Sequence, residues 1–386
     1  MLIDLYIVSY NRPDYLSCLL NSLDQQNCNG YEIGNIHLFQ DGPNPDRRDE
    51  DAHKIASCIE FFQRTFPSGH VHAAETNIGI NGNYKKLWDD MISSNSAAAI
   101  VFEDDLELSP HYLDVMNMLL RRAEENPNVG LVFAVGILGI PYEFQKQRIK
   151  ALMPMSTAFS IHRWGWGITR DVIKEFYPIK NMYFDVASRF GYADNGDKER
   201  EMKCRDDLLE FFNTVGVYQN MYAIQVDAVY DLAALLLNRV NLTTYASYAR
   251  STGEVGLHST EEFFNRLGYK HSVVMDEAPQ DFDWYEPEMM LDILSTIRRF
   301  HTNIRTNYNS GKYAAPIPYP AINKTNLFEC LYKQILGWPI TQDNLRAHNI
   351  INYSPDNNTE FYDYERFELM SLGHRKKKNY KFPYAI

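Results

Sequence analysis

The stretch AAAIVFEDDLELSP (97–110) joins an apolar run, three consecutive acidic residues and a helix start. AAAIVF (97–102) predicts a short buried strand. Ser109 and Pro110 are the residue types that favour a helix N-cap and a first helical position. The acidic triplet between the two elements is therefore expected at the carboxyl end of a strand, where open α/β sheets bind their ligands.

The triplet itself consists of Glu103, Asp104 and Asp105. Adjacent carboxylates repel one another unless a positive group lies between them, and a hard divalent cation completed by phosphate oxygens meets that need. A solvated acidic turn is the alternative interpretation, because runs of like charge are usually exposed. The rest of the chain has to distinguish the two.

Strands and helices alternate through the first part of the chain. Strands are predicted at 2–10, 35–41, 70–74, 97–102 and 129–135. Helices are predicted at 13–25, 49–65, 82–91 and 110–125. This alternation is typical of βαβ units and predicts an α/β fold, Rossmann-like, with a mostly parallel sheet flanked by helices. Residues 1–258 are expected to form the catalytic domain and 259–386 a mainly helical C-terminal extension.

Composition narrows the class of protein. The 386 residues carry a net charge of −12, which argues against non-specific nucleic-acid binding. No stretch approaches the about 20 apolar residues of a membrane span, and the N-terminus has the pattern of a strand rather than of a signal peptide. The five cysteines are scattered and form no CxxC pair, so we expect reduced thiols in a cytoplasmic protein without a zinc site.

Polar residues also follow the other predicted strands. Because the carboxyl ends of parallel strands meet at one sheet edge, these residues are candidates for binding a nucleotide. The candidates are Ser9, Asn11, Arg12, Asp41, Asn77, Gly79 and Lys85. Asp41 is placed to accept a hydrogen bond from a base, and the turn at 79–82 lets helix N-terminal amides approach an anion. Ordinary turn chemistry would also explain each loop, and neither GxGxxG nor GxxxxGK[ST] occurs where it would be needed.

Several motifs resemble a known family. The segments LYIVSYNRPDYLSCLLNSL, FQDGP, NIGINGNYKKLWD and IVFEDDLELSPHYL resemble the GT-A glycosyltransferases, especially the N-acetylglucosaminyltransferase I group and bacterial HlpA-like glycosyltransferases. The likeness continues through FSIHRWGWGITRDV, VDAVYDLAALLLNRVN and STGEVGLHST and covers about residues 1–260. Two positions depart from the family pattern: Tyr230 stands where Trp usually precedes Asp, and Leu257-His258-Ser259 replaces Thr-His-Thr.

The resemblance implies roles for the triplet. Asp105 would bind Mn²⁺ or Mg²⁺ on the diphosphate of a nucleotide-sugar donor, which is expected to be UDP-linked in such enzymes. Asp104 would contact the ribose, and Glu103 would support the nucleoside. His258 would be a second metal or diphosphate ligand, with a purely structural histidine as the alternative.

A general base and an acceptor site are also implied. Asp231 and Asp207 match acidic positions of the two groups, and we favour Asp231 as the base of an inverting displacement. A helix N-terminal acid stabilised by the helix dipole is the alternative for both. Trp164 and Trp166 lie two residues apart, so in an extended segment both point to one side. They are candidates for stacking on an acceptor sugar, and core packing explains them equally well.

The resemblance thus implies a metal-dependent hexosyl- or N-acetylhexosaminyltransferase acting on a glycan or lipid-linked glycan in surface polysaccharide or glycoconjugate synthesis. The alternatives are a sugar-nucleotide nucleotidyltransferase and a non-catalytic carbohydrate-binding protein. The basic cluster 374–378 with Lys381 suggests peripheral contact with the inner membrane face through the C-terminus. A solvated terminus is the alternative there.

Overall fold

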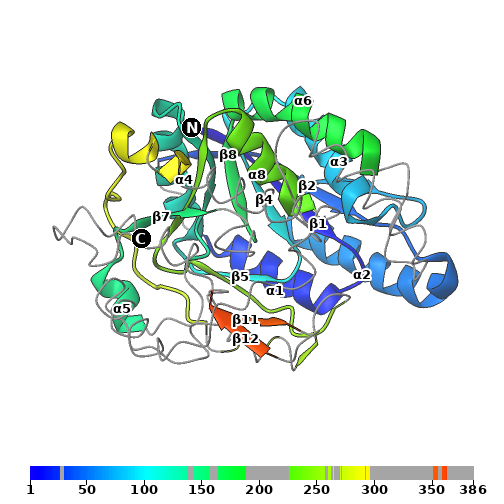
Figure 1. The fold of residues 1–386 in the computed structure, drawn as a ribbon. Helices are drawn as coiled ribbons and strands as arrows, with labels where there is room; N and C mark the ends of the chain where they lie inside the picture. The colour runs from blue at the N-terminus through cyan, green and yellow to red at the C-terminus, as the bar shows by residue number, and fades with distance from the viewer. Residues whose placement is uncertain are drawn as a thin grey trace.

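The computed structural model describes residues 1–26, 30–136, 142–155, 164–187, 226–256, 260–261, 264, 270, 272–291, 293–295, 351–354 and 359–362. A single sheet dominates this part of the chain (Figure 1). Its strand order is β3-β2-β1-β4-β8-β6-β9-β7. The strands are β1 (Leu2–Ser9), β2 (Glu32–Gln40), β3 (His70–Ala73), β4 (Ala98–Glu103), β6 (Val129–Phe133), β7 (Leu152–Met155), β8 (Trp166–Thr169) and β9 (Val240–Thr244).

The sheet is mostly parallel, as the alternation of elements predicts. Strands β3, β2, β1 and β4 run parallel to one another, and β6 is parallel to β9. Strand β8 is antiparallel to both β4 and β6, and β7 is antiparallel to β9. The predicted α/β fold with a mostly parallel sheet flanked by helices is therefore confirmed.

Helices cover the sheet on both faces. The helices are α1 (Pro13–Asp24), α2 (Arg48–Thr65), α3 (Gly79–Ser93), α4 (Tyr112–Glu125), α5 (Tyr142–Gln147), α6 (Arg170–Ala187) and α8 (Val226–Leu236). The chain steps from β1 through β2 to β3 and then turns back to β4, so right-handed crossovers place α1 and α2 on one face and α3 on the other. Helix α1 packs on α2, while α3 packs on β1, β2 and α6 (Figure 1).

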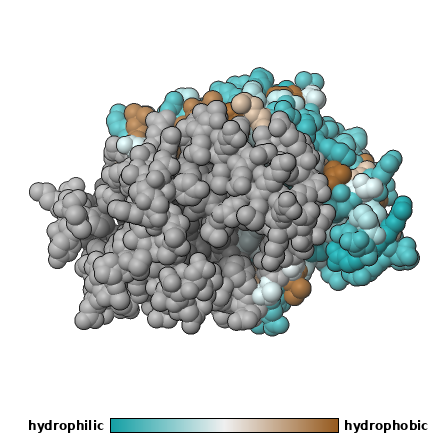
Figure 2. All heavy atoms as spheres, turned by 45° about the vertical axis from the view of Figure 1, so that its right-hand side comes forward, coloured by the Kyte–Doolittle hydropathy of each residue, from teal (hydrophilic) through white to brown (hydrophobic). Residues whose placement is uncertain are grey.

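The core follows from this layering. Strand β4 is apolar apart from its last residue and buried along Ala98–Phe102, as expected for a strand covered on both faces. The described surface in Figure 2 is mainly hydrophilic, with apolar residues scattered among polar ones. None of the described helices has the length and apolar character needed to cross a membrane.

A second, two-stranded sheet lies beside the acidic triplet and was not predicted. Strand β5 (Leu106–Leu108) pairs antiparallel with β10 (Ala249–Ser251). The pairing brings Thr252 against the triplet, where its backbone N–H donates to the Asp105 carbonyl at 2.7 Å. A segment about 140 residues downstream therefore lies directly beside Asp105.

Some predicted boundaries were wrong. The helix after the triplet begins at Tyr112 rather than at 110, because Ser109 instead closes a turn in which its Oγ accepts from the His111 N–H at 3.2 Å. The helix predicted from 82 begins at Gly79, which adopts φ +70°. Strands β7, β8 and β9 were not predicted.

The C-terminal region is described only in part. Met275 and Ile293 are buried in the main core, and the Met275 N–H donates to the Ser247 carbonyl at 2.7 Å. Further along, β11 (Ile351–Ser354) and β12 (Thr359–Tyr362) form an antiparallel hairpin that was not predicted. The domain boundary at 258 and the mainly helical character of 259–386 stay predictions.

Candidate functional site

Two neighbouring strand ends carry the centre of the candidate site. Strand β1 is parallel to β4 with Val8 opposite Glu103, so the residues that follow each strand meet at one edge. The Ser9 hydroxyl donates to Asp104 Oδ2 at 3.2 Å, and the Tyr10 backbone N–H reaches the same oxygen at 3.4 Å. The loop after β1 thus holds the carboxylate of Asp104, which is only 2% exposed.

Arg12 lies between the two aspartates. Its guanidinium forms an ion pair with Asp104 Oδ1 and donates through Nη1 to Asp105 Oδ2 at 3.0 Å. Burial opposes the charge on Arg12, but the two carboxylates raise the pKa of the guanidinium above its ordinary value. The structure therefore supplies one fixed positive charge for two buried carboxylates.

One carboxylate oxygen of Asp105 has no hydrogen-bond donor among the described residues. This oxygen, Oδ1, is buried. Burial raises the pKa of Asp105, and the neighbouring Arg12 counteracts that rise. A buried carboxylate oxygen without a donor is costly unless a ligand completes it.

Gly253 makes room for this carboxylate. A Cβ built on Gly253 would lie 2.2 Å from Asp105 Oδ2, closer than any atom can approach. Glycine is therefore required if the carboxylate is to keep its position. Because Mg²⁺ and Mn²⁺ favour oxygen ligands and Mg²⁺ typically takes one or two carboxylates plus phosphate oxygens, the residues around Asp105 Oδ1 fit such an ion.

Glu103 stands apart from the two aspartates. It is the last residue of β4 and is half-buried. The Tyr84 hydroxyl of α3 lies 3.5 Å from its Oε1. The triplet thus divides into a pair joined by Arg12 and a third carboxylate that faces α3.

Asp41 lies at the end of β2 and is surrounded by donors. Oδ1 accepts from the N–H groups of Gly42 and Ile78, both at 2.8 Å. Oδ2 accepts from the Gly79 N–H and from Asn77 Nδ2, both at 3.0 Å. Burial raises the pKa of Asp41, while these backbone donors act in the opposite direction. The amides at the start of α3 therefore bind the chain's own carboxylate, and a role of Asp41, Asn77 and Gly79 in nucleotide binding stays a prediction.

Asn11 and Lys85 have partners of their own. Asn11 Nδ2 donates to Asp51 Oδ1 at 2.7 Å, and the Tyr10 hydroxyl donates to Asp51 Oδ2 at 2.6 Å. Burial disfavours the Asp51 carboxylate, but these hydrogen bonds together lower its pKa. Lys85 pairs with Asp89 one turn along α3 at 3.4 Å. Sequence reasoning missed Asp51, which holds the loop after β1, because nothing in RDEDAHK distinguishes it from the exposed acids beside it.

The two candidate acceptor tryptophans differ in exposure. Trp166 is 1% exposed and packs between Trp88, with ring centroids 5.8 Å apart, and Tyr230, at 5.1 Å. For Trp166 the structure thus favours core packing, the alternative that the sequence left open. Trp164 is half-buried against the core and remains a candidate for the acceptor side.

The candidate bases and the second metal ligand are described least. The backbone of Asp231 lies in α8, directly after the buried Tyr230, and its side chain lies outside the described part. Asp207 and His258 fall outside the described residues altogether. Their roles stay predictions.

Comparison with known proteins gives weak matches. No family model matches the chain, and no curated protein matches it. Among solved structures, S. aureus TarS is 13% identical over 65% of this chain and 37% of that chain, with a TM-score of 0.36. TarS 1-349 in complex with UDP-GlcNAc is 14% identical over 72% and 68%, with a TM-score of 0.39. The chain thus spans just over a third of the length of the first TarS chain that it matches.

A third match is glucosyl-3-phosphoglycerate synthase from Mycobacterium tuberculosis, in complex with Mn²⁺, UDP and phosphoglyceric acid. It is 12% identical over 48% of this chain and 62% of that chain, with a TM-score of 0.27. At these values the likeness carries no argument about the site. The site has to be interpreted from its own geometry.

Proposed function

We propose that the protein is a metal-dependent glycosyltransferase of the GT-A type that uses a nucleotide-sugar donor, with UDP as the nucleotide. One observation carries the proposal: two buried, adjacent carboxylates at the carboxyl edge of a parallel sheet, one of which keeps an open oxygen. This is the edge at which α/β sheets bind nucleotides. An acidic pair of this kind suits a cation and a diphosphate better than it suits a solvated turn.

Each group at the edge has a proposed task. Asp105 Oδ1 holds Mn²⁺ or Mg²⁺, and Asp104 orients the ribose. Arg12 holds both carboxylates in place before the donor arrives. When a sugar departs, a bound cation supplies charge neutralisation at the diphosphate that remains. The fixed guanidinium lowers the cost of assembling these carboxylates, which is the preorganisation that favours catalysis.

The acceptor hydroxyl needs a base on the opposite side of the sugar in an inverting reaction. We assign this role to Asp231, with Asp207 as the alternative. Asp231→Asn should retain metal-dependent UDP binding and lose transfer by about 10²–10⁴-fold, because an amide cannot take the proton. Asp207→Asn is the matched variant and should retain most activity. The reverse order of the two losses would move the assignment to Asp207, and a retained anomeric configuration in the product would exclude the inverting course.

The reaction class is tested by product analysis with a panel of UDP-hexoses and UDP-N-acetylhexosamines. A glycosyltransferase hydrolyses or transfers one of these donors in the presence of Mn²⁺, releases UDP and stops when EDTA is added. A nucleotidyltransferase would instead release pyrophosphate from a nucleoside triphosphate and a sugar phosphate. Sugar binding without turnover of any donor would indicate a carbohydrate-binding protein.

For the acceptor we propose a glycan or lipid-linked glycan of surface polysaccharide or glycoconjugate synthesis. The basic C-terminal cluster 374–378, which lies outside the described residues, supports contact with an anionic bilayer. Truncation after Gly373 should lower sedimentation with anionic liposomes and leave donor hydrolysis unchanged. Equal sedimentation of both proteins at low salt, where attraction is screened least, would rule out the membrane contact.

A further inference from the structure

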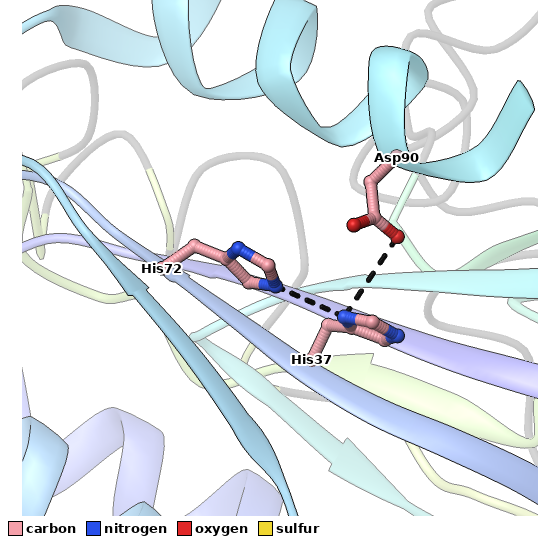
Figure 3. A group of neighbouring side chains, drawn as sticks. All are labelled: His37, His72 and Asp90. Carbon is pink, nitrogen blue, oxygen red and sulfur yellow. Dashed lines mark hydrogen bonds and ion pairs between the residues drawn. The ribbon is translucent and has the colours of Figure 1, made fainter. Parts of the chain in front are cut away.

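A group of metal-type ligands lies on the sheet face beneath α3 (Figure 3). It consists of His37 from β2, His72 from β3 and Asp90 from α3. His37 Nδ1 lies 3.0 Å from His72 Nε2 and 3.8 Å from Asp90 Oδ1. The three potential ligand atoms all lie within 4.8 Å of one another.

Tertiary structure brings these residues together. In the parallel pair of β2 and β3, Phe39 lies opposite His72, and His37 lies one pleat repeat earlier on the same face of β2. Helix α3 packs over β1 and β2 and carries Asp90 to this face. The three side chains point toward a common space in Figure 3.

Neighbouring groups orient two of the three ligands. The Tyr6 hydroxyl donates to Asp90 Oδ1 at 3.1 Å. The Tyr6 ring stacks on His37, with centroids 4.7 Å apart and planes within 5°. A hydrogen bond to a ligating carboxylate is usual behind a metal site, where it fixes the orientation of that carboxylate.

We propose that His37, His72 and Asp90 bind one transition-metal dication, with Zn²⁺ as the probe. Two imidazoles and one carboxylate with an open position are a ligand set that suits Zn²⁺ and its neighbours in the first transition row. With metal–nitrogen distances of about 2.0–2.1 Å, tetrahedral ligand atoms lie about 3.4 Å apart. The two distances from His37 Nδ1 to its neighbours, 3.0 and 3.8 Å, bracket that value.

Burial lowers the pKa of both His37 and His72. The competing arrangement is a hydrogen bond between the two rings without any ion. His72 and Asp90 are half-buried, so the group is not sealed within the core.

This site is separate from the triplet and independent of the proposed glycosyl transfer. Helix α3 begins beside Asp41 at the carboxyl edge, and Asp90 follows eleven residues after Gly79, about 16 Å along the helix. An ion there would link the four-residue edge strand β3 to β2 and α3. The site is therefore inferred to stabilise the sheet edge.

Calorimetric titration of the full-length protein with ZnCl₂, in buffer containing excess MgCl₂ to occupy oxygen sites, tests the proposal. Wild type should bind one equivalent. His72→Ala should bind about 100-fold more weakly or worse, because even residues behind metal ligands contribute about 10- to 100-fold to affinity. Asp90→Asn keeps an acceptor for the Tyr6 hydroxyl and should weaken binding by about tenfold. His53→Ala, at an exposed position of α2, is the matched control and should bind as wild type does.

Two further readouts distinguish this site from others. Co²⁺ should give visible absorption bands typical of a four-coordinate site in wild type and in His53→Ala, but not in His72→Ala. Zn²⁺ should raise the Tm of wild type and leave the Tm of His72→Ala unchanged, while the two proteins unfold at similar temperatures in EDTA. Equal Zn²⁺ affinity of wild type, His72→Ala and Asp90→Asn would overturn the proposal, as would Zn²⁺ binding no tighter than Mg²⁺ binding.

Discussion

Asp41 and Asp105 are both buried aspartates at the carboxyl edge of the same sheet, on either side of β1, yet their surroundings differ. Asp41 accepts four hydrogen bonds, two on each oxygen, from the start of α3 and the loop after β2. Asp105 pairs through one oxygen with Arg12, and its other oxygen has no donor among the described residues.

The difference predicts a structural role for Asp41 and a ligand-binding role for Asp105. An ionised carboxylate offers about four acceptor positions. Asp41 uses them to satisfy amides of α3 that would otherwise be orphaned, so its loss should cost stability. Asp105 leaves positions open at a burial cost, so its loss should cost function. The number of hydrogen bonds that each carboxylate accepts therefore distinguishes the roles of Asp41 and Asp105 better than residue type or exposure does. Both residues are aspartates, and both are buried.

The largest effect should come from Asp105→Ala. We expect transfer to fall by about a thousandfold, about 4 kcal/mol, because the cation on the diphosphate loses its protein ligand. The free energy of unfolding without metal should change by less than about 1 kcal/mol, since Arg12 still pairs with Asp104. UDP titration with and without Mn²⁺, together with urea unfolding, provides both measurements. Unchanged metal-dependent UDP affinity would remove Asp105 from the site.

Asp41→Ala should give the opposite profile. Loss of the carboxylate leaves several buried amides without an acceptor, so we expect about 3 kcal/mol less unfolding free energy. Where the variant is folded, UDP affinity should stay within about twofold of wild type if Asp41 only caps α3. A large loss of UDP affinity with little change in stability would show instead that Asp41 contacts the base, as the sequence suggested.

Arg12→Met tests whether Arg12 and a bound cation neutralise the same two carboxylates, Asp104 and Asp105. Two buried carboxylates without their guanidinium should cost about 2 kcal/mol in metal-free buffer. Mn²⁺ should then raise the Tm of the variant more than that of wild type, because the ion takes over the neutralising role. Lys54→Met removes an exposed pair with Glu50 and is the matched control, with an expected cost of at most about 0.5 kcal/mol. An equal Mn²⁺ shift in wild type and Arg12→Met would contradict the shared site.

Gly253→Ala should have the smallest effect. Its Cβ would displace the Asp105 carboxylate, so we expect Mn²⁺ affinity to fall by about tenfold, with little change in stability. Gly256→Ala provides the comparison, because its Cβ would approach only Arg12 Nη1, at 3.3 Å. Equal Mn²⁺ affinity in both variants would indicate that Asp105 tolerates displacement.

Much of the α/β half and the centre of the site could be predicted from local pattern. The first four strands, the helices between them and the adjacency of Ser9 to Asp104 follow from periodicity and from the parallel βαβ arrangement. The ion pairs of Arg12 could not be predicted, because SYNRPDYL does not show that the guanidinium reaches Asp104 and Asp105. The roles of Asp51 and Gly253 were missed for the same reason. Strand β8 was missed because WGIT is too short to show periodicity.

The sequence by itself determined where the acidic triplet lies, at the end of a buried strand, since strand, carboxylates and helix start are contiguous and their chemistry is local. Only the tertiary structure decided which of the carboxylates have hydrogen-bond donors or ion-pair partners. Three of the four donors to Asp41 come from residues 77–79, the groups facing Asp105 come from residues 12 and 253, and the candidate histidine site joins residues 37, 72 and 90. Hydrogen bonds and ion pairs act over about 3 Å, and positions that distant in sequence reach that separation only once the sheet and its helices have packed.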